Sequence, residues 1–269
     1  MTTPTTPTST TPDAWNHWRD TRVAAAAAPY GPLALTGTHW LAEPPAAPAE
    51  LPDVPGRWSA GADGTVVLTA TAADGLIADG APVDGTVRLR PDTDPAPSVA
   101  EAGERRLIPI AREGVLAVRV YDPAAPARAA FAGIDAYDWS AAWVVPARFT
   151  PYDDDRTVAV PNADGKQRAL ALAGEIAFDL GGETRTLTVG RTATGLSAVF
   201  GDATSGRETY RFRFLTLPAP DADGRTTLDL NRAHLPPCAF ADHFICPFPP
   251  PGNVLPIPVQ AGEKNPIRR

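Results

Sequence analysis

The chain has 269 residues, of which 43% are hydrophobic and 20% charged, enough for one large domain or two modest ones. No apolar stretch approaches the ~18 residues of a membrane span, because the longest alanine-rich run stops at Pro29; this excludes a transmembrane helix. Asp and Glu (31) outnumber Lys and Arg (24), and the net charge is -7, so we expect neither nucleic acid nor a membrane as a partner.

The compartment and the cofactor class follow from what the sequence lacks. The Thr- and Pro-rich N-terminus has neither the cationic start nor the apolar run of a secretory signal, which favours the cytoplasm. With only Cys238 and Cys246, a disulfide framework is excluded, although a single bridge is not. No phosphate loop, dinucleotide fingerprint or zinc-protease motif occurs, so we expect no cofactor.

The first element after the N-terminus is a helix. Residues 1–12 alternate Thr and Pro and predict a disordered tail. Asp13 is a suitable N-cap, alanines favour helix, and Pro29 prevents continuation. One face of this helix carries two aromatic rings and a cation, which suits docking onto a sheet. The residues of that face are Trp15, Trp18 and Arg22.

The rest of the chain predicts β-structure. Short runs of β-favouring residues alternate with Asp-Gly and Gly-Gly turns. We expect strands at residues 33–41, 64–72, 86–89, 105–109, 115–121, 144–150, 156–160, 174–180, 183–189, 196–200, 209–217 and 226–230. A Pro-rich link over 91–104 and an aromatic connector over 131–143 interrupt them.

This pattern predicts a mainly β fold, with sandwich or barrel-like β units and one N-terminal helix. We expect one β domain over residues 13–269, with sub-units at 33–122 and 144–235. From Pro236 the chain is Pro-rich, so it lacks ladder donors and is expected to run extended over the surface of the β domain.

The last third carries a dense signature of Gly, Asp, Asn, Pro and Cys. It covers residues 200–210, 213–215, 228–233, 236–240, 246–247, 249–250 and 253. This signature resembles the bacterial DUF1684 family, a domain of unknown function. The helix around Trp18, residues 35–41 and residues 150–152 are similar to that family too, so the resemblance runs from about Asp13. It implies kinship and no activity.

The sequence also departs from that family. His234 and Leu235 stand where the family more often has Tyr-Asn. If a relative uses that Tyr in a pocket, the chemistry of this protein differs.

The first candidate for chemistry is the strand that ends at Asn231. Alternation places Asp229 and Asn231 on one face, and His234 is the nearby group that titrates near neutral pH. These three side chains suit acid/base catalysis. The alternative is that Asp229 and Asn231 satisfy loop backbone groups and hold the Pro-rich segment.

The second candidate is the cysteine pair with its neighbouring histidines. Cys238 is a candidate nucleophile that His234 or His243 would activate. Cys238, His243 and Cys246 form a Cys-x4-His-x2-Cys spacing, which makes zinc an alternative. A structural disulfide or two buried thiols are the other interpretations.

Further candidates are ligand-binding groups. Glu208, Tyr210, Phe212 and Phe214 occupy every second position of a strand and so lie on one of its faces. Arg211 and Arg213 lie on the other face, and arginines in strands are more often solvated. His39 and Trp40 place an imidazole beside an indole, and arginines suit an anionic ligand. The arginines are Arg22 on the helix and Arg148.

We therefore expect a cofactor-independent small-molecule enzyme with a β-sheet pocket. Its catalytic residues would be the acid/base and thiol groups His234, Cys238, Asp229, Asn231 and Tyr210. The alternatives are a non-catalytic ligand-binding or scaffold module, in which backbone hydrogen bonds consume those groups, and a metal-dependent enzyme. A homo-oligomer is compatible with each.

Overall fold

The computed structural model describes residues 11–269, except the side chain of Asp155, and divides into two compact units. One comprises residues 25–130; the other comprises the described residues up to 24 together with residues 131–269. Most of the expected N-terminal tail lies outside the described residues, but Pro12 already begins helix α1 (Pro12–Ala27). None of the helices within residues 11–269 has the length and apolar character that crossing a membrane requires.

The unit of residues 25–130 is a β sandwich. Its six-stranded sheet has the order β1-β10-β9-β8-β5-β6, and its four-stranded sheet the order β2-β3-β4-β7. The two sheets bury one shared cluster around Trp58, Leu68 and Leu107. The strands are β1 (Leu35–Trp40), β2 (Ala49–Leu51), β3 (Val54–Ala60), β4 (Val66–Ala70), β5 (Leu76–Ala78), β6 (Ala81–Pro82), β7 (Gly85–Leu89), β8 (Ala100–Ala102), β9 (Arg105–Arg112) and β10 (Val115–Tyr121); the helices are η1 (Pro32–Ala34), η2 (Ala72–Asp74) and α2 (Pro126–Ala130).

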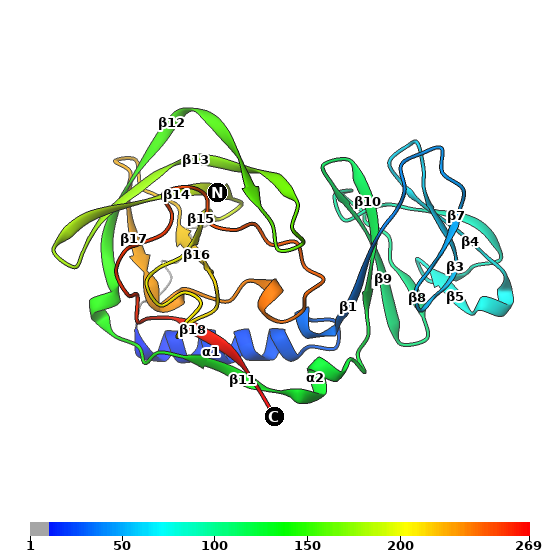
Figure 1. The fold of residues 1–269 in the computed structure, drawn as a ribbon, viewed down its shortest axis with the longest axis horizontal. Helices are drawn as coiled ribbons and strands as arrows, with labels where there is room; N and C mark the ends of the chain where they lie inside the picture. Colours follow the sequence, from blue (N-terminus) through cyan, green and yellow to red (C-terminus); the bar gives the residue numbers. More distant parts are fainter. Residues whose placement is uncertain (1–10) are drawn as a thin grey trace, which may run out of the picture. The chain divides into compact units, whose positions relative to one another are not determined.

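The other unit is built on a nearly closed, barrel-like sheet of order β16-β15-β14-β13-β12-β17 (Figure 1). The two edge strands approach each other where the Thr226 hydroxyl donates to the Pro218 carbonyl at 3.1 Å. A separate pair, β11 with β18, completes the unit. Its elements are β11 (Phe131–Ala136), η3 (Ala141–Trp143), β12 (Val144–Pro161), β13 (Gln167–Leu180), β14 (Glu183–Thr192), β15 (Gly195–Phe200), β16 (Arg213–Pro218), β17 (Arg225–Asp229), η4 (Leu230–Arg232), η5 (Pro237–Ala239) and β18 (Glu263–Arg268).

The interior of this barrel is filled by side chains. Strand alternation directs residues such as Ile176, Leu187 and Leu215 inward, where none exceeds 1% exposure. The hairpin between β13 and β14 turns at Gly181 and Gly182, whose φ angles of 67° and 79° suit glycine. The mainly β fold predicted from the sequence is confirmed.

Helix α1 lies along one end of the barrel, as its aromatic face predicted (Figure 1). The Trp15 indole donates to the Asn231 carbonyl at 2.9 Å, and the Arg19 guanidinium donates to the Ile134 carbonyl at 3.0 Å. These contacts fix residues 11–24 to the loop after β17 and to β11.

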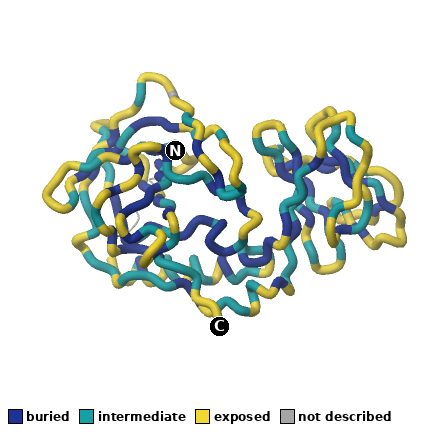
Figure 2. The backbone as a smooth tube through the Cα atoms, viewed as in Figure 1, coloured by how far each residue is buried: buried dark blue, intermediate teal, exposed yellow. Residues whose placement is uncertain are grey.

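The Pro-rich C-terminal segment differs from its prediction. Several of its residues are buried rather than spread over the surface (Figure 2), and Leu255, Val259 and Ala261 belong to the barrel core. The backbone groups of the segment can be buried because neighbouring side chains and strands form hydrogen bonds with them. For example, Leu255 N donates to the Gly201 carbonyl at 2.9 Å. The segment therefore closes the barrel interior.

Candidate functional site

Asp229 and Asn231 hold the loop that follows β17. The Asn231 carboxamide is fully buried: it accepts from Ser140 N at 3.0 Å and donates to the Ser140 carbonyl at 3.0 Å. Asp229 Oδ1 accepts from Asn231 N and Nδ2, and Asp229 Oδ2 lies 3.4 Å from Arg232 Nε. These groups bind one another and the backbone, which is the arrangement that the scaffold alternative predicts.

His234 packs as an uncharged ring between aromatic side chains. Its ring meets Trp18 and Phe214 edge-on, with centroids 6.4 and 6.2 Å apart, and its Nδ1 lies 3.2 Å from the Arg232 carbonyl. Burial, together with the charge of Arg22, lowers the pKa of His234 to about 4. Within the described residues no hydrogen bond joins His234 to Asp229, so this expected acid/base pair does not form.

The two cysteines are brought together, and neither forms a disulfide. The Cys238 amide, in η5, donates to Cys246 Sγ at 3.3 Å. The Tyr210 hydroxyl donates to the Cys238 carbonyl at 3.0 Å and lies 3.7 Å from Cys238 Sγ. Arg211 Nη2 in turn donates to the Tyr210 hydroxyl at 3.1 Å. Of the catalytic residues expected from the sequence, Cys238 and Tyr210 are thus in contact.

The surroundings of Cys238 favour its thiolate. Its hydrogen bond with Cys246 lowers the pKa of the Cys238 thiol, burial opposes this, and Tyr210 and the charge of Arg211 lower the pKa further. Burial raises the pKa of Tyr210 to about 12, so its phenol keeps its proton at neutral pH. Tyr210 is therefore a hydrogen-bond donor to the cysteine loop.

A metal centre does not assemble from the expected ligands. In residues 11–269 no group of three or more His, Cys, Asp or Glu side chains is arranged to hold a metal ion. Cys238 and Cys246 are buried, whereas His243 is exposed. The Cys-x4-His-x2-Cys spacing therefore does not give a ligand set in this fold.

Two of the expected ligand-binding groups of this unit, Arg22 and Glu208, make contacts of their own. Arg22 Nε and Nη2 bind the Glu263 carboxylate at 2.8 and 2.9 Å, with Glu263 only 1% exposed. Glu208 is exposed and accepts from the Tyr137 hydroxyl at 2.8 Å. Arg148 is exposed on β12.

A buried ion pair is the feature that sequence reasoning missed. Arg213 and Asp202 have fully buried side chains, and Arg213 Nη2 donates to Asp202 Oδ2 at 2.6 Å. Arg213 Nη2 also donates to the Val259 carbonyl at 3.0 Å, so the pair anchors the C-terminal segment. The pattern favoured solvated arginines on this strand, and for Arg213 that interpretation was wrong. Asp202 in the Asp-Ala-Thr-Ser-Gly turn was the available signal.

His39 and Trp40 lie on β1 in the other unit, and both are partly buried. They belong to a different unit from the cysteines.

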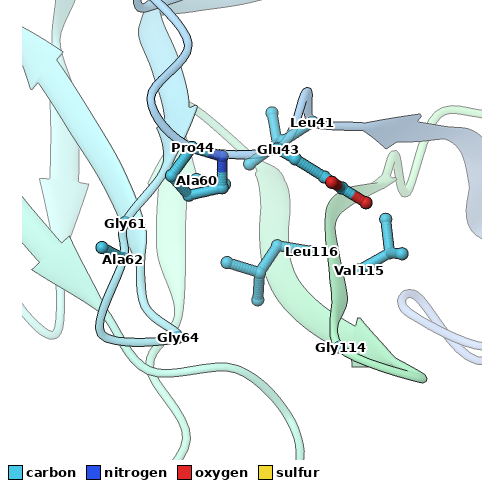
Figure 3. Close-up of a pocket in the computed structure, with 10 residues that line it drawn as sticks. All are labelled: Leu41, Glu43, Pro44, Ala60, Gly61, Ala62, Gly64, Gly114, Val115 and Leu116. Atoms are coloured by element: carbon cyan, nitrogen blue, oxygen red, sulfur yellow. The ribbon is translucent and has the colours of Figure 1, made fainter.

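Two cavities open within residues 25–130. The first, about 180 Å³, is lined by Gly and Ala backbone and by apolar side chains, with Glu43 as its charged group (Figure 3). The second, about 260 Å³, lies over β9 and β10 and is lined by rings and guanidinium groups. Neither contains a residue of the C-terminal signature.

The unit that contains the cysteines is built on a nearly closed, barrel-like sheet, and part of its C-terminal segment is buried in the core of that sheet. Its residues coincide closely with the family model described as "Protein of unknown function (DUF1684)", which matches residues 129–264, and the chain belongs to that family. The match includes the signature from 200 to 253 but not the similar segment at 35–41.

Comparison with solved structures finds an uncharacterised protein. A solution NMR structure of an uncharacterised protein from Haloarcula marismortui is similar at 33% identity; the alignment covers 50% of this chain and 77% of that chain, with a TM-score of 0.42. No curated protein matches the chain.

Proposed function

We propose that this protein is a cofactor-independent thiol enzyme that reduces a small hydroperoxide, with Cys238 as nucleophile and Cys246 as the resolving thiol. The observation that carries the proposal is the contact of the two cysteines, at 3.3 Å between Cys238 N and Cys246 Sγ, beside Tyr210. A second thiol beside the first allows a sulfenic acid to condense to a disulfide, which a single cysteine cannot do within one chain.

The first step uses the Cys238 thiolate. It attacks the terminal oxygen of the hydroperoxide, the S–O bond forms, and the O–O bond breaks to release an alkoxide. The protonated Tyr210 hydroxyl, 3.7 Å from Cys238 Sγ, is the nearby proton donor for that alkoxide, and water returns the proton to Tyr210. Cys238 is left as a sulfenic acid.

The second step uses Cys246. Its thiolate attacks the Cys238 sulfur, the S–S bond forms, and the S–O bond breaks; the hydroxide that leaves takes a proton from the solvent and becomes water. A small external thiol, which reaches the sulfurs through the same kind of local opening as the oxidant, then reduces the disulfide by exchange and restores both cysteines. This cycle needs a reducing compartment, and we therefore place the protein in the cytoplasm.

The size of the oxidant follows from burial. Cys238 and Cys246 are only 4% and 6% exposed, so a bulky disulfide or acyl substrate has no direct approach to either sulfur. Hydrogen peroxide or a small alkyl hydroperoxide is compact enough to reach Cys238 through local opening.

The test is hydroperoxide consumption supported by dithiothreitol, with sulfenic acid trapped by dimedone. Cys238→Ser is expected to abolish turnover and labelling. Cys246→Ser is expected to stop multiple turnover while increasing dimedone labelling at Cys238. Tyr210→Phe retains the ring and removes the hydroxyl, so it is expected to slow the first step. Equal turnover in Cys238→Ser and the unsubstituted protein would overturn the proposal.

A non-catalytic scaffold is the second candidate, and the hydrogen bonds that Asn231 makes with Ser140 and with Asp229 Oδ1 support it. It expects both thiols to remain unreactive towards hydroperoxide while the protein is folded. It also expects Cys238→Ser to change stability without changing peroxide consumption.

A further inference from the structure

The second cavity of residues 25–130 is built on one face of two neighbouring strands. In the antiparallel pair β9 and β10, Arg119 lies opposite Ile108, and Tyr121 lies opposite Arg106. Alternation places these four side chains on the same face, while Leu107, Val118 and Val120 point to the sandwich core from the other face. The face away from the core thus carries charge and aromatic surface rather than a uniform polar coat.

Residues from outside the two strands complete the cavity. Tyr30 precedes η1; its hydroxyl donates to the Glu104 carbonyl at 3.0 Å, and its ring lies 3.8 Å from Arg106 Cζ. Asp92 comes from the loop after β7. Ile110, only 1% exposed, adds an apolar surface. The cavity therefore combines two phenol rings, two guanidinium groups and two isoleucines in about 260 Å³.

The charge of this cavity is positive. Its acidic lining residue, Asp92, is engaged by Arg112 at 2.8 and 2.7 Å and by the Ala111 amide at 3.1 Å. With that carboxylate matched to Arg112, the charges of Arg106 and Arg119 face the cavity. Glu101 forms an ion pair with Arg106 at 3.6 Å, and because the two side chains are 40% and 44% exposed, solvent weakens this pair.

Burial lowers the pKa of Arg119, while Tyr121 and Asp92 raise it. The guanidinium nevertheless keeps its charge, because arginine is not deprotonated in proteins. A charged donor set that is partly withdrawn from water binds an anion more strongly than an exposed one does.

We propose that this cavity is a binding site for a small aromatic carboxylate. Arg119 and Arg106 would bind the carboxylate, and the rings of Tyr30 and Tyr121 with Ile108 would hold a single planar ring. The volume is below the ~300–1,000 Å³ of sites for drug-sized ligands, which limits the ligand to about one ring with a short acidic substituent. The site is independent of the cysteine pair, which lies in the other unit.

The experiment is a titration of the full chain with benzoate, monitored by amide chemical shifts and, separately, by calorimetry. Benzoate is expected to shift amides of β9 and β10. Benzyl alcohol, which keeps the ring, and inorganic phosphate, which keeps negative charge, are each expected to bind at least tenfold more weakly. Equal binding of benzyl alcohol would overturn the role of the guanidinium groups, and equal binding of phosphate would overturn the role of the rings.

Substitutions locate the site. Arg119→Gln is expected to weaken benzoate binding at least tenfold. Arg106→Gln is the second variant, because its side chain is 44% exposed and its replacement leaves the core untouched; it is expected to weaken binding several-fold. Arg57→Gln, an exposed arginine on β3 in the same unit, is the matched control and is expected to bind as the unsubstituted protein does. Unchanged affinity in both Arg119→Gln and Arg106→Gln would refute the proposal.

Discussion

The buried pair Arg213–Asp202 gives the sharpest stability prediction. Asp202 Oδ2 accepts from Arg213, while Asp202 Oδ1 accepts from Thr204 N and Thr204 Oγ1 at 2.7 Å each and from Val259 N at 3.2 Å. Asp202→Asn keeps the shape but replaces one oxygen by an NH₂ group. Either orientation of the amide points donors at donors, and the buried guanidinium loses its counter-charge.

The expected loss is about 3–5 kcal/mol in the free energy of unfolding, the range found when one partner of a buried ion pair is removed. In urea, with an m-value of about 2 kcal/mol/M, this corresponds to a fall of about 1.5–2.5 M in the midpoint. The assay is urea unfolding monitored by hydrogen exchange of the β16 amides. These amides report on the barrel unit rather than on the sandwich.

Asp223→Asn is the matched control. Asp223 pairs with Arg225 in the same unit, but both side chains are more than half exposed, at 63% and 66%. Its loss is expected to stay below about 1 kcal/mol. If Asp202→Asn destabilised the barrel unit no more than Asp223→Asn does, the assignment of Arg213–Asp202 as the anchor of the C-terminal segment would be refuted.

Three further predictions concern the same unit. His234 has a pKa of about 4 in the folded protein against 6.5 in the unfolded chain, so its contribution to stability is complete above pH 6.5 and is lost as the pH falls towards 4. In a pH series of unfolding midpoints, the free energy of unfolding is expected to fall by about 2–3 kcal/mol over this range. In His234→Asn this pH-dependent fall is expected to be much smaller. Asn253→Ala leaves Thr188 N, the Thr188 carbonyl and the Val199 carbonyl without their buried partner. Calorimetry is expected to show that the free energy of unfolding falls by about 3 kcal/mol, and an unchanged melting temperature would contradict this. Gly262→Ala adds a Cβ 2.4 Å from the Ala233 carbonyl oxygen at a φ of 78°. Chemical denaturation is expected to show that the free energy of unfolding falls by more than about 2 kcal/mol. Gly252→Ala is the control and is expected to lose less, because the space around its added Cβ is open.

Local patterns predicted many elements of the fold. Helix α1 ends at Ala27 because Pro29 follows closely, and the runs at 105–109 and 115–121 correspond to β9 and β10. The two runs at 144–150 and 156–160 form one long strand, β12, since the irregular stretch between them interrupts pairing without ending it. The pattern could not show this, because strand continuity depends on the partner β13.

Elements that depend on distant partners were missed. The aromatic connector at 131–143 contains β11, which forms only because β18 pairs with it from the far end of the chain. Likewise, short β8 lies in the stretch expected as a Pro-rich link, where pairing with β9 and β5 stabilises three residues of weak propensity.

The candidate site was predicted in part. Proximity in the sequence predicted that Asp229, Asn231 and His234 lie together, but their side chains contact different partners. Asn231 binds Ser140 and Asp229 within the loop, whereas the His234 ring packs against Phe214. The contact of Tyr210 with Cys238 spans 28 residues and depends on the path of the Pro-rich segment, which no local period encodes.

The most direct measurement is the intact mass and peptide map of the folded, reduced protein after one equivalent of hydrogen peroxide, without added thiol. The thiol-enzyme account predicts a loss of two hydrogen atoms and a peptide cross-linked between Cys238 and Cys246, restored by dithiothreitol. An unchanged mass, with both cysteines alkylated only after unfolding, would contradict it.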